Sequence, residues 1–202
     1  MKSDTVSIVI SGVGGQGVLT LAEILAKAAL SDSHNVRVGE IHGMAQRGGH
    51  VACTVRIGTG ARGPIVDPGT ASLLVGFEPV ETLREAHMIR EDGCVLLSSH
   101  IQYPVAVSMG KAAYPTNKEI IDGIRKFTDR IIEFDAMAIA KEAGSSRALN
   151  MVMLGAVVGT GLTPITEEAA IDAVRNTFSK KFESINIKAV KMGQEKIEEL
   201  NR

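Results

Sequence analysis

The chain has 202 residues, 45% of them hydrophobic, and its 22 basic and 23 acidic residues give a net charge of −1. This length is enough for one domain with a buried core, and the balanced charge offers no basic field to attract nucleic acid or a membrane surface. Aromatic residues make up only 3% and tryptophan is absent, which argues against a sugar-binding groove or a base-stacking platform.

The N-terminal part of the chain predicts a strand–loop–helix–strand unit. Residues 5–11 form a short β-branched run that is typical of a central parallel strand. Residues 18–30 repeat apolar positions at three- and four-residue steps, which predicts a helix with one apolar face. Residues 35–39 predict a second strand. We expect the two strands to be parallel and adjacent, with a right-handed crossover.

The rest of the chain alternates strand-like and helix-like runs. Further strands are predicted at residues 50–57, 71–75, 94–97 and 130–134. Further helices are predicted at residues 79–91, 117–127, 135–143, 149–158, 167–178 and 181–200. Gly93 is expected to stop the first of these helices and Asn117 to cap the second. Residues 99–116 are predicted to be irregular or to form short edge strands.

These elements predict an α/β fold, with three Rossmann-like layers, a mostly parallel or mixed sheet and a helical C-terminal region. No repeat or linker divides the chain, so we expect one domain over residues 1–202. We expect a cytoplasmic protein without a signal peptide, because no apolar run is long enough to span a bilayer. Cys53 and Cys94 are expected to be buried, reduced thiols, and two cysteines are too few for a four-thiolate iron–sulfur cluster.

A glycine-rich motif joins the first strand to the first helix. Gly12, Gly14 and Gly17 satisfy G-x-G-x-x-G in the context that lets backbone amides approach a pyrophosphate. One interpretation is a dinucleotide site in which Glu40 accepts from a ribose hydroxyl, although the Gly15-Gln16 insert is unusual for it. The glycines could instead serve only to pack the helix on the sheet. A third interpretation is a different phosphate-bearing ligand, shared with a partner chain.

A polar segment, residues 40–49, follows the second predicted strand. We expect it to converge with the glycine motif, because loops after strand C-termini line the ligand crevice of such folds. Arg47 could bind a carboxylate or phosphate, or form a surface ion pair. His42 could donate a proton near neutral pH or only brace the loop, and His50 is expected to be structural. The histidines have no metal-site spacing, and no nucleophile elbow, P-loop or paired-carboxylate arrangement is present.

The motifs at 12–19 (GVGGQGVL) and 40–49 (EIHGMAQRGG) resemble the gamma-type domain of 2-oxoacid:ferredoxin oxidoreductases. Three further stretches agree with this family: residues 76–79 with 81–84, residues 150–156, and Asn186 with Lys188-Ala189 and Gly193. Together they span nearly the whole chain. The HGMAQRGG variant and the length are most similar to the beta subunit of the indolepyruvate (arylpyruvate) type within the family.

The resemblance implies a reaction whose cofactors lie on another chain. Enzymes of this family decarboxylate a 2-oxoacid oxidatively with coenzyme A, giving an acyl-CoA, carbon dioxide and reduced ferredoxin. Thiamine diphosphate, Mg²⁺ and iron–sulfur clusters are then expected on a larger partner subunit, since this chain lacks a GDG signature and has two cysteines. Ferredoxin would be reached through the complex, and neither nucleic acid nor a membrane is expected as a partner.

The task that the resemblance leaves to this chain is to complete the substrate or coenzyme A pocket. It has no catalytic residue or metal site of its own on this view. The expected binding residues are Gly14, Gly15, Gln16, Gly17, His42, Gln46 and Arg47. The alternatives are a stand-alone Rossmann-like NAD(P)-binding oxidoreductase and a module that binds a small ligand. Helices near 149–158 and 181–200 could dock the larger subunit, or the first of them could simply be part of the core.

Overall fold

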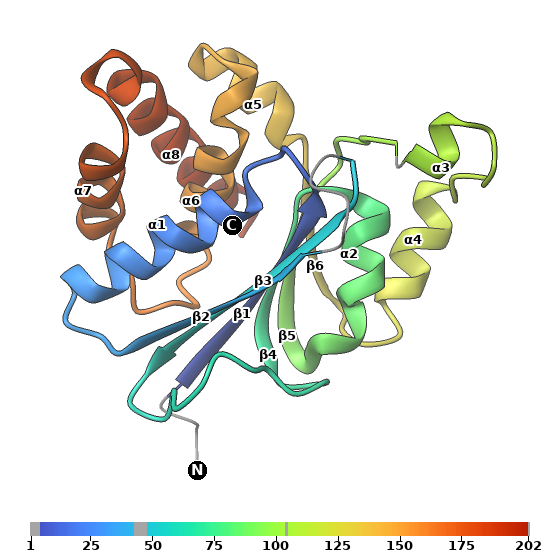
Figure 1. Cartoon of the computed structure of the whole chain (residues 1–202), viewed down its shortest axis with the longest axis horizontal. Coiled ribbons are helices and arrows are strands. Elements are labelled where there is room, and N and C mark those ends of the chain that lie inside the picture. Colours follow the sequence, from blue (N-terminus) through green and yellow to red (C-terminus); the bar gives the residue numbers. More distant parts are fainter. Residues whose placement is uncertain (1–4, 43–47, 104, 202) are drawn as a thin grey trace.

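The computed structural model describes residues 5–42, 48–103 and 105–201. Its strands form one mixed sheet in the order β2-β3-β1-β4-β5-β6, which lies between two layers of helices (Figure 1). The strands are β1 Thr5–Val13, β2 Val36–His42, β3 His50–Gly58, β4 Ala71–Gly76, β5 Ile89–Ser98 and β6 Arg130–Phe134. The helices are α1 Val18–Ser31, α2 Pro79–Glu85, α3 Val105–Ser108, α4 Asn117–Ile124, α5 Ala136–Ala143, α6 Leu149–Gly159, α7 Glu167–Thr177 and α8 Lys180–Leu200. The predicted three-layer α/β fold is confirmed.

The order of the strands corrects one prediction. β1, β4, β5 and β6 are parallel neighbours, but β3 is antiparallel to both β1 and β2. β2 therefore runs in the same direction as β1 without being its neighbour, and the predicted adjacency of the two strands is wrong. Only residues 43–49 connect β2 to β3, which is too short for a parallel crossover but enough for an antiparallel return. The returning strand takes the place beside β1.

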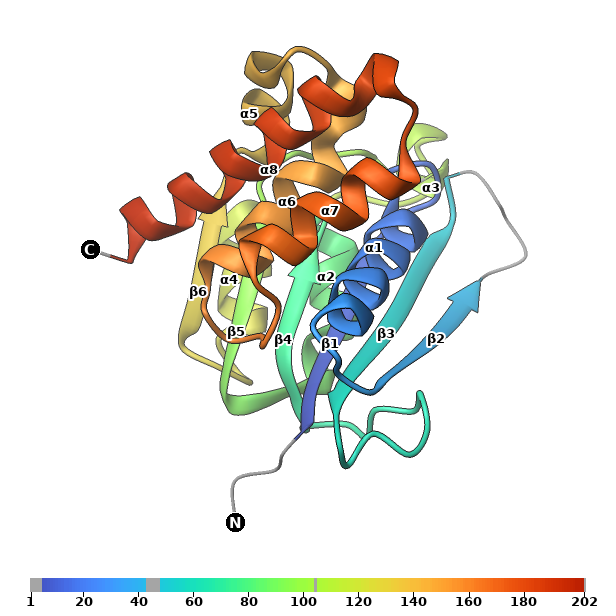
Figure 2. The same ribbon diagram turned by 90° about the vertical axis from the view of Figure 1, so that its left-hand side faces the viewer.

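Alternating side chains of the strands supply two separate cores. Ile8 and Ile10 of β1 face α1, α5, α6, α7 and α8, whereas Val9 faces the opposite layer. That opposite layer consists of α2 and α4, which contribute Leu83 and Ile120 to the second core. Figure 2 shows α1, α6, α7 and α8 over one face of the sheet. This period-two burial on both faces matches the apolar strand patterns of the sequence.

Several helices and strands begin or end at other residues than predicted, because some residues belong to a neighbouring element. The helix predicted at 79–91 ends at Glu85, a short 3₁₀ turn follows, and β5 already begins at Ile89, which pairs with Ala71. Gly93 consequently lies inside β5 and does not stop a helix. α4 is capped by Thr116, not by Asn117, through a reciprocal capping box with Glu119. Residues 105–108 form the short helix α3, where irregular chain or edge strands were predicted.

The C-terminal motif residues serve helix packing. A Cβ atom at Gly155 of α6 would overlap the carbonyl oxygen of Val190, and one at Gly193 of α8 would overlap that of Val152. The two glycines thus allow the backbones of α6 and α8 to touch. Residues 149–157 are all buried within this chain, so the core interpretation of the segment holds. Cys53 and Cys94 are buried free thiols, as predicted.

No helix within the described residues is both long and apolar enough to cross a membrane.

Candidate functional site

The glycine motif forms the turn between β1 and α1, at the edge where the parallel strands end (Figure 1). Gly15 and Gly17 have φ values of 106° and 89°, a region that side chains disfavour, so glycine is required for this turn. Gly17 is also the N-cap of α1, and no side chain caps this helix. The N–H groups of its first turn are therefore suited to an anionic ligand.

Gln16 holds the glycine loop, residues 12–17, in shape. Its Oε1 accepts from the N–H of Val13 at 2.8 Å, and its Nε2 donates to the carbonyl of Phe77 at 3.3 Å. The side chain is buried, with 9% of its surface exposed. These bonds tie the loop to the connection between β4 and α2. Gln16 was predicted as a binding residue, and its contacts within the chain give it a bracing role as well.

Residues 48 and 49, the described end of the predicted 40–49 loop, contact the glycine loop, whereas residues 40–42 belong to β2 and not to a loop. The Gly14 N–H donates to the Gly49 carbonyl at 2.9 Å, and the Gly48 N–H donates to the Gly14 carbonyl at 3.3 Å. Residues 48 and 49 come directly before β3, and β3 is the neighbour of β1, so they lie beside the glycine loop that follows β1. The prediction had β2, not β3, beside β1. Of the other predicted site residues, Gln46, Arg47 and the side chain of His42 lie outside the described residues; the backbone of His42 ends β2.

A hollow of about 450 Å³ opens beside the glycine loop and is called the glycine-loop hollow below. Its lining includes Gly15, Gln16, Gly17, Gln102, Arg147 and Asn150. The chain thus brings the β1–α1 turn together with the start of α6 and with the segment after β5. Gln102 and Arg147 could not be predicted as site residues from the sequence, because neither belongs to a recognisable motif. Asn150 offered a signal, since it is a polar residue at the head of the apolar run 150–156.

Two polar side chains of the hollow, Asn150 and Arg147, have no side-chain partner among the described residues. The side chain of Asn150 is only 7% exposed, yet it has no hydrogen-bond partner in the described part of the chain. It lies against Gly17, since a Cβ atom there would come within 2.7 Å of the Asn150 Nδ2. Arg147 is exposed at the rim and forms no ion pair with any described residue. A buried amide, a guanidinium and an uncapped helix terminus together suit a ligand with negative charge.

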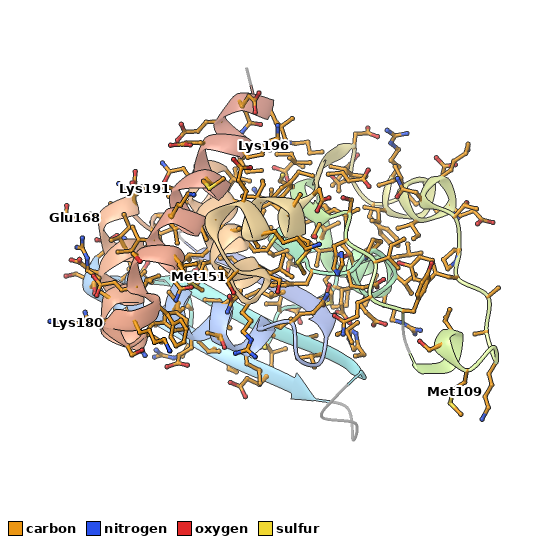
Figure 3. The ribbon with its side chains drawn as sticks, turned by 90° about the horizontal axis from the view of Figure 1, so that it is seen from above. Met109, Met151, Glu168, Lys180, Lys191 and Lys196 are labelled. Carbon is orange, nitrogen blue, oxygen red and sulfur yellow. The ribbon has the colours of Figure 1, made fainter. Side chains whose placement is uncertain are left out.

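A larger surface hollow, of about 850 Å³, runs along α8 on another side of the molecule. Figure 3 shows Lys180, Lys191 and Lys196 spaced along this helix, far from Met109 near α3. This hollow is lined by residues of α8 alone, among them both lysines and glutamates. The central backbone groups of a helix are already hydrogen-bonded within it. Without converging elements or free backbone donors, it lacks the features that make the glycine-loop hollow a site.

A polar cluster braces the opposite side of the glycine loop. Nδ1 of His50 lies 2.6 Å from Glu81 and Nε2 lies 3.0 Å from Glu85, both on α2. These two carboxylates raise the pKa of His50 to about 9, against the opposing effect of burial. Glu78, which caps α2, is fully buried and accepts from the hydroxyl of Tyr114. Burial raises the pKa of the Glu78 carboxyl above its usual range.

The geometry also bears on the dinucleotide interpretation. A Rossmann-type dinucleotide site needs an acid at the end of the strand next to the glycine turn. Glu40 lies on β2 opposite Cys53 of β3, and β3 separates it from β1. The arrangement therefore disfavours the ribose contact that was considered for Glu40.

Comparison with known proteins supports a specific family. The family model for pyruvate ferredoxin/flavodoxin oxidoreductase matches residues 7–196. Indolepyruvate oxidoreductase subunit IorB from Archaeoglobus fulgidus is 42% identical over 187 residues, which cover 93% of this chain and 92% of that protein. Ketoisovalerate oxidoreductase subunit VorA from Methanothermobacter marburgensis is 36% identical over 191 residues, or 93% of this chain but 36% of that protein.

A solved structure agrees over the whole fold. The gamma subunit of a keto/oxoacid ferredoxin oxidoreductase from Geobacter sulfurreducens superimposes with a TM-score of 0.71 at 26% identity, covering 96% of this chain and 99% of that one. The resemblance indicated by the sequence motifs is thereby confirmed.

Proposed function

We propose, from the premise that the chain belongs to the pyruvate ferredoxin/flavodoxin oxidoreductase family, that its glycine-loop hollow completes the coenzyme A site of a 2-oxoacid:ferredoxin oxidoreductase. The chain is the small subunit of such an enzyme. The assembled enzyme would convert a 2-oxoacid and coenzyme A into an acyl-CoA and carbon dioxide and pass two electrons to ferredoxin. In this proposal the chain binds and orients the cosubstrate and contributes no reacting group.

The observation that carries the proposal is the convergence of unpaired donors at the hollow. Coenzyme A carries phosphate groups, which are anionic and accept hydrogen bonds. The α1 N-terminus, the amide of Asn150 on α6 and the guanidinium of Arg147 on the 3₁₀ turn just before α6 supply the complementary donors. We assign phosphate contacts to the backbone amides of Gly15 and Gly17, which line the hollow, and to Arg147, whereas the Gly14 N–H is already bonded to the Gly49 carbonyl and Gly14 shapes the loop. Arg47, Gln46 and His42 are proposed as further binding residues for the same ligand.

We place thiamine diphosphate, its Mg²⁺ and the iron–sulfur clusters on a larger partner subunit. The chain has two thiols, and both are buried in the core. Burial raises the pKa of Cys53 to about 12, which keeps it from becoming the thiolate that binds iron. Free, reduced cysteines also support a cytoplasmic location.

The surface beside the hollow supports a partner that closes it. Gln102 lines the hollow, and its neighbours Ile101 and Tyr103 are 42% and 56% exposed. Exposed apolar side chains next to a polar hollow are typical of an interface. The match to VorA, in which a segment similar to this chain is about a third of a longer protein, also supports a tight association with further domains. We propose that residues 1–202 form one domain in that assembly.

We propose an arylpyruvate such as indolepyruvate as the substrate, because the relative at 42% identity is named for it. A relative named for ketoisovalerate also matches most of the chain, so substrate choice has to be measured.

The experiment is a strip-and-restore assay under anaerobic conditions. The complex is purified from native extract, and this chain is removed and then added back. Reduction of ferredoxin or a viologen dye is followed with indolepyruvate, phenylpyruvate and pyruvate. The proposal expects a larger iron–sulfur partner and a coenzyme A-dependent activity that is lost and then restored. Isolation of the chain alone, with tight binding of a nicotinamide dinucleotide, would contradict it.

A further inference from the structure

His50 joins the glycine loop to α2. It is the first residue of β3 and lies opposite Val13, the last residue of β1. Its ring extends to α2, where Glu81 and Glu85 are one helical turn apart and present their carboxylates on the same face. The ring therefore spans the gap between the end of the central strands and the helix on the opposite layer.

Both nitrogens of this ring must carry hydrogens. The Glu81 Oε2 lies 2.6 Å from Nδ1 and the Glu85 Oε1 lies 3.0 Å from Nε2. An ionised carboxylate can only accept, so each nitrogen has to donate, and the ring is an imidazolium. The Glu81 side chain is 4% exposed, and a carboxylate that is so buried depends on its cationic partners.

The backbone beside His50 carries this anchoring to the glycine loop. Gly49, its neighbour, accepts the Gly14 N–H, and Gly48 donates to the Gly14 carbonyl. On its other side the loop is held by Gln16, which donates to the carbonyl of Phe77. Phe77 directly precedes the α2 cap Glu78, whose carboxylate accepts from the N–H of Glu81. Both routes from the loop thus end at α2, the Gln16 route at its first turn and the His50 route along its length.

We infer that His50 is a positioning residue, whose imidazolium between Glu81 and Glu85 holds the glycine loop in its ligand-binding position, and that loss of the ring proton releases the loop. The effect on ligand binding rests on the proposed function; the effect on the loop does not.

The charged groups around His50 determine the pH at which the glycine loop is released. Glu81 and then Glu85 raise the pKa of His50 to about 9. The imidazolium and its two carboxylate contacts therefore persist through neutral pH and are lost as the pH rises through that value. Arg84 also contacts Glu81, with its Nε 3.3 Å from Oε2, and is the competing cation on α2. Glu78 at the helix cap and Tyr114 beyond it form their own pair, and Val13 on β1 carries no charge.

The test measures hydrogen-exchange protection of residues 12–17 in the full chain and in the assembled complex. His50→Gln removes the cation, whereas Arg84→Gln, the matched control, removes a cation beside the same Glu81 without touching the loop. We expect His50→Gln to lower protection of the loop by at least about tenfold, since a charged hydrogen-bonded contact is lost. Arg84→Gln should leave it unchanged. In the complex, the KM for coenzyme A should rise while kcat changes by less than about twofold.

A pH series tests the ring proton itself, because a purely structural role of His50 would leave loop protection independent of pH. Protection of the wild-type loop, corrected for intrinsic exchange rates, should fall as the pH passes through about 9. Glu85→Gln keeps one carboxylate partner and should shift this fall to lower pH, so it also serves if His50→Gln does not fold.

Equal loop protection in wild type and His50→Gln, or an unshifted pH profile in Glu85→Gln, would overturn the inference. Lost protection with an unchanged KM for coenzyme A would confirm that His50 holds the loop and overturn the effect on ligand binding. A wild-type complex without any coenzyme A dependence would refute the proposed function instead, and the exchange comparison would still decide whether His50 holds the loop.

Discussion

Asn150 at the start of α6 packs directly against Gly17, the N-cap of α1, so that a Cβ atom on Gly17 would come within 2.7 Å of the amide nitrogen. The contact brings the first turns of two helices to one point of the glycine-loop hollow. Asn150 is buried and has no hydrogen-bond partner among the described residues, and it therefore presents its amide to whatever occupies the hollow.

Gly17→Ala is expected to destabilise the chain more than Gly15→Ala. Both positions have positive φ, which costs an alanine about 1 kcal/mol, but only position 17 also meets Asn150, whereas nothing lies near a Cβ atom at position 15. We expect an additional loss of about 1–3 kcal/mol for Gly17→Ala, measured by urea unfolding. Equal losses for the two variants would show that the contact with Asn150 is not tight.

Asn150→Asp separates an anion site from a simple packing contact. The side chains have the same shape, but the carboxylate would repel phosphate in the hollow. We expect the KM for coenzyme A to rise by at least about tenfold in the assembled enzyme. The two helix N-termini offset the burial of the new charge, so the free energy of unfolding should change by about 1 kcal/mol or less. An unchanged KM would mean that no anion binds beside Asn150.

Arg147→Ala should weaken coenzyme A binding by about tenfold, since one charge-assisted contact at the rim is lost. Arg175→Ala is the matched control, because Arg175 is also exposed but lies on α7 and pairs with Asp172 at 2.8 Å. Steady-state kinetics with varied coenzyme A would measure both. A similar rise in KM for the two variants would point to a general charge effect and not to a contact in the hollow.

The stability of the chain should depend on pH through His50. Its folded-state pKa of about 9 exceeds the unfolded value of 6.5, so the contribution is complete below pH 6.5 and disappears as the pH rises through 9. The difference in unfolding free energy between wild type and His50→Gln should shrink by about 1–2 kcal/mol over this range, less than the full shift because the ring is one-third exposed. Urea titrations at pH 6, 7.5 and 9 would measure it; a difference that is independent of pH would contradict the imidazolium assignment.

Gly155→Ala should disrupt the crossing of α6 and α8. The added methyl group would overlap the Val190 carbonyl oxygen, which is backbone and cannot rotate away. We expect a loss of about 3 kcal/mol in thermal or urea unfolding. Gly63→Ala, at a position with nothing near a Cβ atom, should be close to neutral. A mild effect of Gly155→Ala would mean that the helices can separate at little cost.

The main elements could be predicted from the sequence, because burial on both faces of the strands and on single faces of the helices leaves a clear periodic pattern. The convergence of the two loops followed from the rule that strand C-termini share an edge. The neighbour of β1 could not be predicted in the same way. Strand periodicity shows that a segment belongs to a sheet, but it does not show which strand is its neighbour. Here β3, which follows β2 after the short connection 43–49, is the neighbour of β1.

The candidate site was predicted only in part, for a physical reason. Gly15 and Gly17 predict a turn in the sequence, because the positive φ of both positions favours glycine. Arg147 and Gln102 are ordinary exposed or half-buried polar residues, and only the packing of α6 and the segment after β5 brings them to the hollow. His50 was expected to be structural, but its partners Glu81 and Glu85 lie more than thirty residues away and no sequence pattern links them.

The most direct test of the account is hydrogen exchange of the assembled enzyme with and without coenzyme A. The glycine-loop hollow predicts that coenzyme A protects residues 14–20 and 146–150, while exchange along α8 stays the same. Protection confined to α8, or none anywhere in this chain despite coenzyme A-dependent turnover, would place the cosubstrate elsewhere and contradict the assignment.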